Sequence, residues 1–216
     1  AEPLVRELFI QIMEKGGHPH PMVALPGMMP FSQDEFYLTY ANDSQLDFVP
    51  TFYKLAYDEF ESRIRIHSST NTRGTTNLDP VKAQRRGKAI SGITEAQMRR
   101  GGEGKFKWVT TLYPTDAYAQ DAGMSLKDYE DFVFNAVHAH EADPIAYWNS
   151  TAAGQQKAID FLARKDVVTL RGPNVDLTLS IKNRKFMNST GMYNMPDGEI
   201  YTGPVEDSLN GWVKYT

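Results

Sequence analysis

Cysteine is absent from the 216-residue chain. Its absence excludes disulfides, thiolate metal ligands and cysteine nucleophiles together. It suits a reducing compartment, so we expect a cytoplasmic protein. No apolar run approaches the roughly 18 residues that a membrane span needs, and no basic segment followed by an apolar one opens the sequence as a signal peptide would. We therefore expect no membrane partner.

A large excess of one charge sign is also missing. Lys and Arg total 23 while Asp and Glu total 27, which gives a net charge of −4. Such a mildly acidic chain is not steered as a whole toward nucleic acid, which is therefore not an expected partner. Hydrophobic residues make up 41% of the chain and charged residues 23%. This balance is typical of a folded domain with a sizeable core rather than of a disordered chain.

Residues 1–165 show a pattern of alternating helices and strands. Pro3 suits the first turn of a helix, apolar residues then recur at helical spacing, and Gly16-Gly17 is typical of a helix end. Further helices are expected from residue 32, over 49–60, from 79 to 88 or further, over 93–100 (helical or irregular), from 125 through the histidines near 140, and over 145–164. Strands are expected over 21–25, 62–67 and 106–112, and a loop over 114–122. This order predicts an α/β fold, a layered domain with a mostly parallel sheet and flanking helices.

The pattern changes after residue 165. Residues 167–170 and 176–181 alternate like strands around a turn at Gly172-Pro173-Asn174, and two more strands are expected over 185–188 and 211–215. We interpret 166–216 as the first antiparallel strands of a second domain. The chain begins at Ala1 without Met and stops at Thr216 inside an expected strand. We therefore expect a fragment that is truncated at both ends.

The five histidines give only weak signals. They are His18, His20, His67, His138 and His140. His138 and His140 lie near the expected end of the helix that begins at Ser125, where positions two apart point about 200° away from each other. They would then not bind one metal ion together, and favourable charge at a helix C-terminus is the simpler interpretation. His67 ends an expected strand, where a hydrogen-bonded structural histidine is favoured over a catalytic one.

Two other patterns around residue 100 have an ordinary and a functional interpretation. Gly101-Gly102-Glu103-Gly104 could cradle a phosphate, but a phosphate loop leads from a strand into a helix, and here a strand follows, so a plain turn is favoured. Residues 82–107 hold eight basic and two acidic side chains, a local balance of 8 − 2 = +6. A solvated helical face is the ordinary interpretation. Contact with nucleic acid or with another charged partner is the alternative, although the scarcity of aromatic residues there offers no stacking surface for single strands.

The most specific signal lies in the last fifty residues. Asp197-Gly198 indicates a turn, and Gly203-Pro204 ends the next segment. Glu199 is therefore expected at the junction between a tight turn and a strand. A carboxylate fixed at such a junction is well placed to bind a metal ion. On spacing alone, an exposed turn glutamate is the simpler interpretation.

This region resembles the M29 family of thermophilic metalloaminopeptidases, the aminopeptidase T, aminopeptidase S and aminopeptidase II group. The similarity rests on the Glu-x-x-Thr-x-Pro motif of residues 199–204, which follows Asn-x-Pro at 194–196, and on the strand segment 172–178. The segment Glu141 to Trp148 is similar to the family's Asp-Pro-x-x-x-Trp helix start. The match spans the chain but is weak before about residue 125.

The resemblance implies a zinc- or cobalt-dependent exopeptidase with two metal ions close together, which acts on peptides. Only Glu199 matches a metal ligand of the family. The other ligands and the catalytic tyrosine lie downstream of this motif in the family, so no catalytic residue is assigned, and none of the five histidines matches a ligand position. The fragment alone is expected to bind metal weakly or not at all and to show little or no turnover. In this family the amino-terminal domain helps to form a dimer and restricts entry to the active site, which implies a homodimer.

Two hypotheses from different functional classes follow. The first is that residues 1–165 are the amino-terminal α/β domain of such an aminopeptidase and 166–216 the beginning of its truncated catalytic domain. The second is a non-catalytic binding module whose contact surface is the basic stretch 82–107. Steep salt dependence of binding to a polyanion would favour the second hypothesis. The sequence does not indicate substrate preference or substrate-binding residues.

Overall fold

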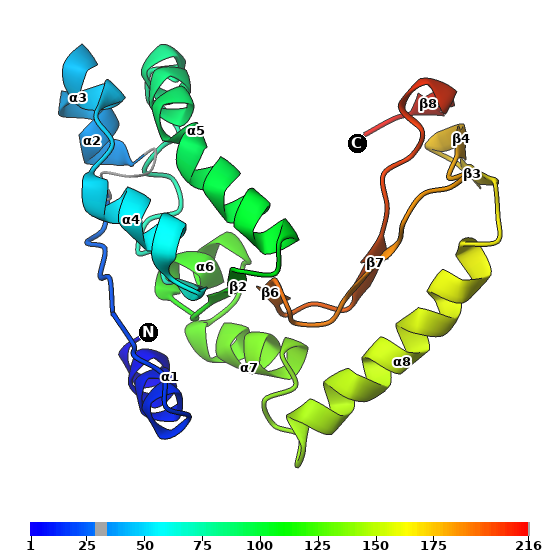
Figure 1. The fold of residues 1–216 in the computed structure, drawn as a ribbon, viewed down its shortest axis with the longest axis horizontal. Helices are drawn as coiled ribbons and strands as arrows, with labels where there is room; N and C mark the ends of the chain where they lie inside the picture. The colour runs from blue at the N-terminus through cyan, green and yellow to red at the C-terminus, as the bar shows by residue number, and fades with distance from the viewer. Residues whose placement is uncertain (29–33, 216) are drawn as a thin grey trace. The chain divides into compact units, whose positions relative to one another are not determined.

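The computed structural model describes residues 1–28 and 34–215. The chain separates into two compact units, Ala1–Val133 and Phe134–Thr216 (Figure 1). Residue 165, the predicted domain boundary, lies within the second unit. The division into domains at that residue stays a prediction.

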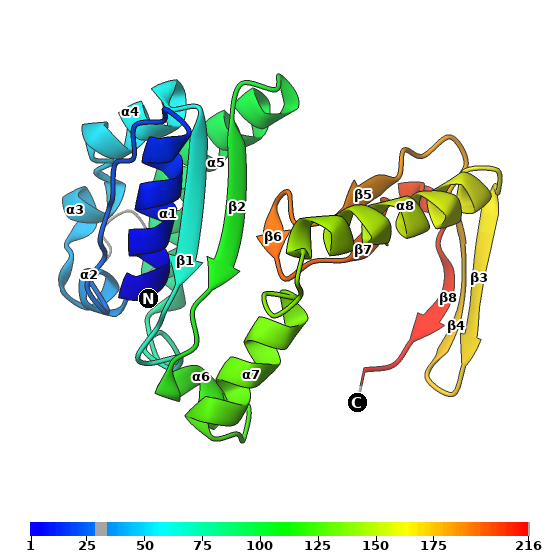
Figure 2. The same ribbon diagram turned by 90° about the horizontal axis from the view of Figure 1, so that it is seen from below.

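The first unit is built around a pair of parallel strands. Its elements are α1 (Glu2–Glu14), α2 (Glu35–Tyr40), α3 (Asp43–Asp47), α4 (Thr51–Glu59), β1 (Ser62–His67), α5 (Pro80–Gly102), β2 (Lys107–Leu112), α6 (Asp116–Asp121) and most of α7 (Leu126–Ala136). The register of the two strands runs from Ser62 opposite Lys107 to His67 opposite Leu112. Helices α4 and α5 lie on one side of this pair and α1 on the other (Figures 1 and 2). The connection between parallel strands through a helix is the arrangement that the sequence predicted.

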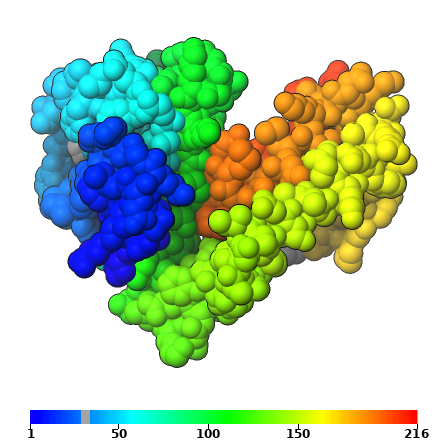
Figure 3. Space-filling view, turned by 60° about the horizontal axis from the view of Figure 1, so that its bottom comes forward, coloured from blue at the N-terminus to red at the C-terminus, as the bar shows by residue number. Residues whose placement is uncertain are grey.

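The core of the first unit lies where α4 and α5 meet β2. Its buried members are Tyr57, Ile93, Ala96 and Phe106. A smaller cluster of Leu38, Ala41 and Leu46 lies where α2 and α3 approach the start of α5. Helix α1 contributes no buried residue and lies on the surface (Figure 3). Residues of the long helix α5 pack in both clusters.

The second unit combines one long helix with antiparallel strands. Its elements are α8 (Pro144–Leu162), β3 (Val167–Gly172), β4 (Val175–Ser180), β5 (Met187–Ser189), β6 (Asn194–Met195), β7 (Glu199–Tyr201), the short 3-10 helix η1 (Glu206–Ser208) and β8 (Asn210–Val213). β4 pairs antiparallel with both β3 and β8, and β5 pairs antiparallel with β7. Helix α8 packs against β5 and β7. The α/β class, with a parallel pair followed by antiparallel strands, is confirmed.

Two predicted elements are wrong. Residues 21–25 form no strand, and Val23 and Leu25 remain 85% and 62% exposed, since no strand among the described residues pairs with this segment. Residues 114–122 are not all loop, because they contain α6, whose first turn is capped by the Thr115 side chain accepting from the Tyr118 N–H. A helix of six residues is too short to show a clear apolar period.

Other expectations are refined rather than reversed. The expected helices near 79–88 and 93–100 are one helix, α5, which continues through Gly92 and contains Gly101 and Gly102. The predicted start of α2 at Ser32 and Gln33 falls outside the described residues, as does Thr216; the observed N-cap is Asp34. In the described parts of the chain, no helix combines the length and apolar character needed to cross a membrane.

Candidate metal-binding residues

Glu199 is the first residue of β7, where it lies opposite Ser189 of β5. The tight turn predicted at Asp197-Gly198 is not formed. Instead, the Asp197 carboxylate accepts hydrogen bonds from the buried Ser189 hydroxyl at 2.8 Å and from the Gly191 N–H at 2.6 Å. Gly198 has a φ of 115°, which a residue with a side chain rarely adopts. The backbone that leads into Glu199 is therefore held by the Asp197 side chain rather than by a hydrogen-bonded turn.

Gln155 of α8 holds the backbone of Glu199 from the other side. Its Nε2 donates to the Glu199 carbonyl at 2.9 Å, to the Ser189 carbonyl at 3.2 Å and to Oδ1 of Asn188 at 2.8 Å. Asn188 in turn donates to the Ala152 carbonyl of α8. One amide group thus links the helix to both strands of the β5–β7 pair, which fixes where the Glu199 side chain starts.

The Glu199 side chain itself is exposed. Within residues 1–28 and 34–215 its carboxylate makes no hydrogen bond or ion pair. An exposed carboxylate on a fixed backbone fits the role of a metal ligand, since carboxylate oxygens bind zinc and related ions. The described residues include no group of three potential ligands around it. They therefore offer one candidate ligand at this position and no group of three.

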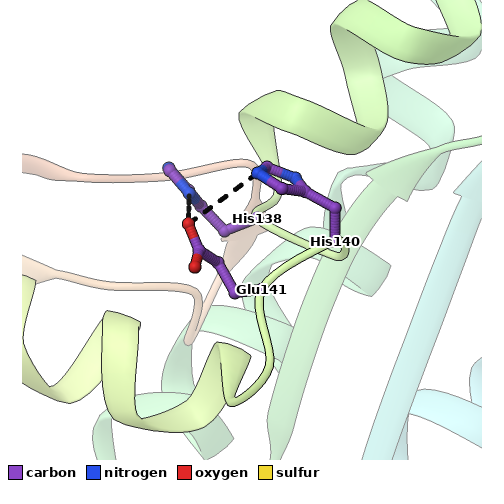
Figure 4. A group of neighbouring side chains, drawn as sticks. All are labelled: His138, His140 and Glu141. Atoms are coloured by element: carbon purple, nitrogen blue, oxygen red, sulfur yellow. Dashed lines mark ion pairs between the residues drawn. The ribbon is translucent and has the colours of Figure 1, made fainter.

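His138, His140 and Glu141 lie together, which the sequence interpretation did not anticipate. Helix α7 ends at Ala136, before either histidine, so the two imidazoles are not on opposite faces of a helix. His138 has a φ of 57° and turns the chain away from the helix axis. Nδ1 of His138 and Nε2 of His140 lie 3.6 and 3.8 Å from Oε1 of Glu141 (Figure 4). The geometric reason for excluding a shared metal ion is therefore wrong.

The other histidines do not join a candidate site. His20 lies against the ring of Phe60, with 5.4 Å between centroids. His67 is half-buried at the end of β1, and burial, reinforced by Arg65 and Arg63, lowers its pKa below the usual 6.5. No potential metal-binding group within the described residues includes His18, His20 or His67.

The basic stretch 82–107 is only partly the solvated face that the sequence favoured: Lys88, Arg99, Lys105 and Lys107 are exposed, and the other four cations bind within the unit. Lys82 donates to the carbonyls of Leu38, Thr39 and Ala41. Arg85 pairs with Asp43 and Asp47, and its hydrogen bond lowers the pKa of the Asp47 carboxyl. The paired positive charges of α5 hold the α2–α3 segment in place instead of facing a partner.

Two further arginines of this stretch are buried. Arg86 donates to the carbonyls of Leu46 and Phe48, and burial lowers its pKa. Arg100 donates to the carbonyls of Tyr57 and Phe60. Gly101 to Gly104 lie at the C-terminal end of α5. A helix leaves backbone carbonyls, not N–H groups, without helical hydrogen bonds at this end, so the segment does not form a phosphate cradle.

Sequence reasoning missed Gln155 and the grouping of Glu141 with the histidines. Gln155 lies 44 residues before Glu199, and an isolated glutamine on a helix carries no pattern that indicates its partner. The spacing His-x-His-Glu of residues 138–141 was visible. A helix that continued through residue 140 would have put the two imidazoles on opposite faces, and the sequence has no glycine that marks the earlier end of α7.

Comparisons with known proteins identify relatives over the whole chain. The family described as thermophilic metalloprotease (M29) matches residues 1–216. A search of curated proteins found no match. Among solved structures, wild-type AmpT from Thermus thermophilus is similar, with a TM-score of 0.74 and 20% sequence identity. The similarity covers 98% of this chain and 56% of AmpT, so the chain spans little more than half the length of that protein.

Proposed function

Because the chain belongs to the M29 family of thermophilic metalloproteases, we propose that residues 1–216 form the amino-terminal part of a metal-dependent aminopeptidase. The proposed reaction is the release of N-terminal amino acids from peptides. The match of the family to all 216 residues supports the peptidase class. The coverage of 56% of AmpT supports the assignment to part of a longer protein.

The observation that carries the proposed role of Glu199 is its fixed backbone combined with its exposed, unpartnered carboxylate within the described chain. Two divalent ions, zinc or cobalt, would polarise the scissile carbonyl and lower the pKa of a bound water. In this proposal Glu199 provides one ligand, and Gln155 and Asp197 hold the strand that carries it. A complete site needs several carboxylates and imidazoles, so this chain alone is expected to show little or no turnover.

A non-catalytic binding module is the second candidate function. It would require the cations of residues 82–107 to face a partner. Lys82, Arg86 and Arg100 instead donate to backbone carbonyls of the same unit, and Arg85 is paired with two aspartates. These contacts give four of the eight cations a structural role, whereas Lys88, Arg99, Lys105 and Lys107 are exposed.

Three finer points belong to the same proposal. A homodimer is proposed because a closed two-fold dimer is the commonest assembly. A cytoplasmic location is proposed because the chain has no cysteine. Zinc and cobalt are both retained as the metal, since one carboxylate does not distinguish them.

The test measures hydrolysis of a leucine or arginine aminoacyl chromogenic substrate with added zinc or cobalt. The chain is assayed beside a protein extended to the full length of the solved relative. We expect activity only in the extended protein, and we expect Glu199→Ala to abolish it. Glu206→Ala is the matched control, because Glu206 is an exposed glutamate of the same unit that pairs with Arg184.

Retained activity in Glu199→Ala would remove the proposed ligand role while leaving the peptidase class intact. An extended protein that stays inactive with either metal would contradict the aminopeptidase proposal itself. In that case, binding of the chain to a polyanion such as heparin, measured from low to high salt, would decide whether the binding-module hypothesis replaces it.

A further inference from the structure

Three potential metal ligands converge in the turn between α7 and α8. Oε1 of Glu141 lies 3.6 Å from Nδ1 of His138 and 3.8 Å from Nε2 of His140. The ligand atoms of the three residues all lie within 4.8 Å of one another. These separations are too long for hydrogen bonds. Figure 4 shows the three side chains directed toward a common point.

The backbone at His138 is one that normally favours glycine. The Ala139 N–H donates to the Phe134 carbonyl and the His138 N–H to the Asn135 carbonyl, both at 3.0 Å. This pair of bonds is the Schellman helix ending, in which the residue at the position of His138 has a positive φ. A side chain there costs about 1 kcal/mol or more. The sequence places an imidazole where glycine would be less strained.

Helix capping does not account for the imidazole. The carbonyls of Phe134 and Asn135 already accept backbone N–H groups. Nδ1 of His138 is buried and has no hydrogen-bond partner among the described residues. Buried polar atoms without a hydrogen-bond partner are rare in folded proteins. Such an atom therefore indicates a ligand, ion or water that completes its interactions. The Nδ1 atom faces Glu141, where an ion would supply that partner.

Aromatic packing holds His138 in place. Its ring stacks on Tyr147 with centroids 3.5 Å apart, and the ring of Trp148 meets it edge-on at 5.8 Å. The indole N–H of Trp148 donates to the Val137 carbonyl. Helix α8 therefore fixes both the ring and the turn before any ion binds, which reduces the entropy cost of binding.

We propose that His138, His140 and Glu141 bind a divalent transition-metal ion, with zinc the preferred occupant. Two imidazoles and one carboxylate form a donor set that zinc accepts at about 2.0–2.2 Å per bond. Ligands of a tetrahedral zinc ion are then roughly 3.3 Å apart, so ligand atoms that lie within 4.8 Å of one another need to approach by about 1.5 Å at most. Three protein ligands leave a fourth position open to water. This site is separate from Glu199 and does not depend on the aminopeptidase proposal.

The experiment titrates the chain with Zn²⁺ by calorimetry and with Cu²⁺ by tryptophan fluorescence. We expect one high-affinity equivalent of Zn²⁺, and quenching by Cu²⁺ that Trp148→Phe largely removes. We expect Zn²⁺ at about 100 times its dissociation constant to raise the melting temperature by roughly 5 °C. Both His138→Gly and His140→Ala should weaken Zn²⁺ binding at least tenfold, because each removes a ligand.

The controls separate this site from other metal contacts. His138→Gly relieves the positive-φ strain, so loss of binding in a folded variant reports the missing imidazole. His138→Asn is a second variant, since asparagine also tolerates this conformation. His18→Ala and Glu206→Gln, which change side chains outside both proposed metal positions, should leave Zn²⁺ affinity unchanged. The proposal is overturned if the chain binds no Zn²⁺, or if binding survives His138→Gly and His138→Asn.

Discussion

Arg86 is a buried cation whose hydrogen bonds hold two helices of the first unit together. Its side chain is 0% exposed, and it donates to the Leu46 carbonyl at 3.0 Å and to the Phe48 carbonyl at 2.6 Å. Its guanidinium also lies 4.8 Å from the centre of the Tyr37 ring. Helix α5 is thereby hydrogen-bonded to the C-terminal end of α3, and the same guanidinium contacts the Tyr37 ring of α2.

The substitution Arg86→Met replaces this group by an apolar side chain of similar length. Two hydrogen bonds from a charged donor are worth about 1.5–3 kcal/mol each, and the contact with Tyr37 adds about 1 kcal/mol. Replacing the buried charge by an apolar group also removes its desolvation penalty, which offsets about 1–4 kcal/mol of this loss of stability. We expect the free energy of unfolding to fall by about 2–3 kcal/mol, because two carbonyls are left without a donor.

Urea unfolding followed by circular dichroism measures this change. Arg85→Met is the matched control, since it removes the same charge from the neighbouring position on α5. Arg85 is paired with exposed aspartates and should destabilise the protein distinctly less. Equal loss of stability in the two variants would show that the buried hydrogen bonds of Arg86 are not what connects these helices.

Three further changes have expected outcomes. Burial lowers the pKa of His67, so as the pH falls the unfolded state binds a proton at this residue before the folded state does. The free energy of unfolding should therefore decrease as the pH drops below about 6.5. The urea midpoint of His67→Gln should decrease less over the same pH range. Gln155→Leu removes the donor to three oxygens and should cost about 1–3 kcal/mol in urea unfolding, whereas the exposed Gln156→Leu should cost far less. Gly211→Ala would put a Cβ atom 2.0 Å from a carbonyl oxygen of β4 at a φ of 127° and should lower the melting temperature strongly; Gly203→Ala, which meets no atom within 4 Å, should not.

The elements that the sequence predicted best are those with local signals. Ser125 and Asp128 exchange hydrogen bonds at the start of α7, as the capping-box spacing indicates. Asp143 caps α8 through the Ala146 N–H. The alternating residues of β3 and β4 pair around Pro173-Asn174. In each case the information lies within a few residues of the element.

The failures have two physical origins. The predicted strand at 21–25 has suitable residues, but no strand in the described part of the chain pairs with it, and a strand needs a neighbour that shares its hydrogen bonds. His138 ends α7 in a conformation that glycine usually provides, so the sequence shows no stop signal there. The contact from Gln155 to Glu199 joins distant parts of the chain. Such long-range contacts depend on the packing of α8 and are not encoded in a local pattern.

The two proposed metal positions differ in how much of the protein they need, and metal stoichiometry can therefore separate them. His138, His140 and Glu141 lie within four residues, so this chain should bind one zinc ion at that turn by itself. Glu199 supplies a single carboxylate and needs ligands from elsewhere. If both proposals hold, the extended protein binds three ions by elemental analysis, His138→Gly removes one without loss of peptidase activity, and Glu199→Ala removes activity while the ion at the turn remains. Loss of activity with His138→Gly would contradict the independence of the two sites.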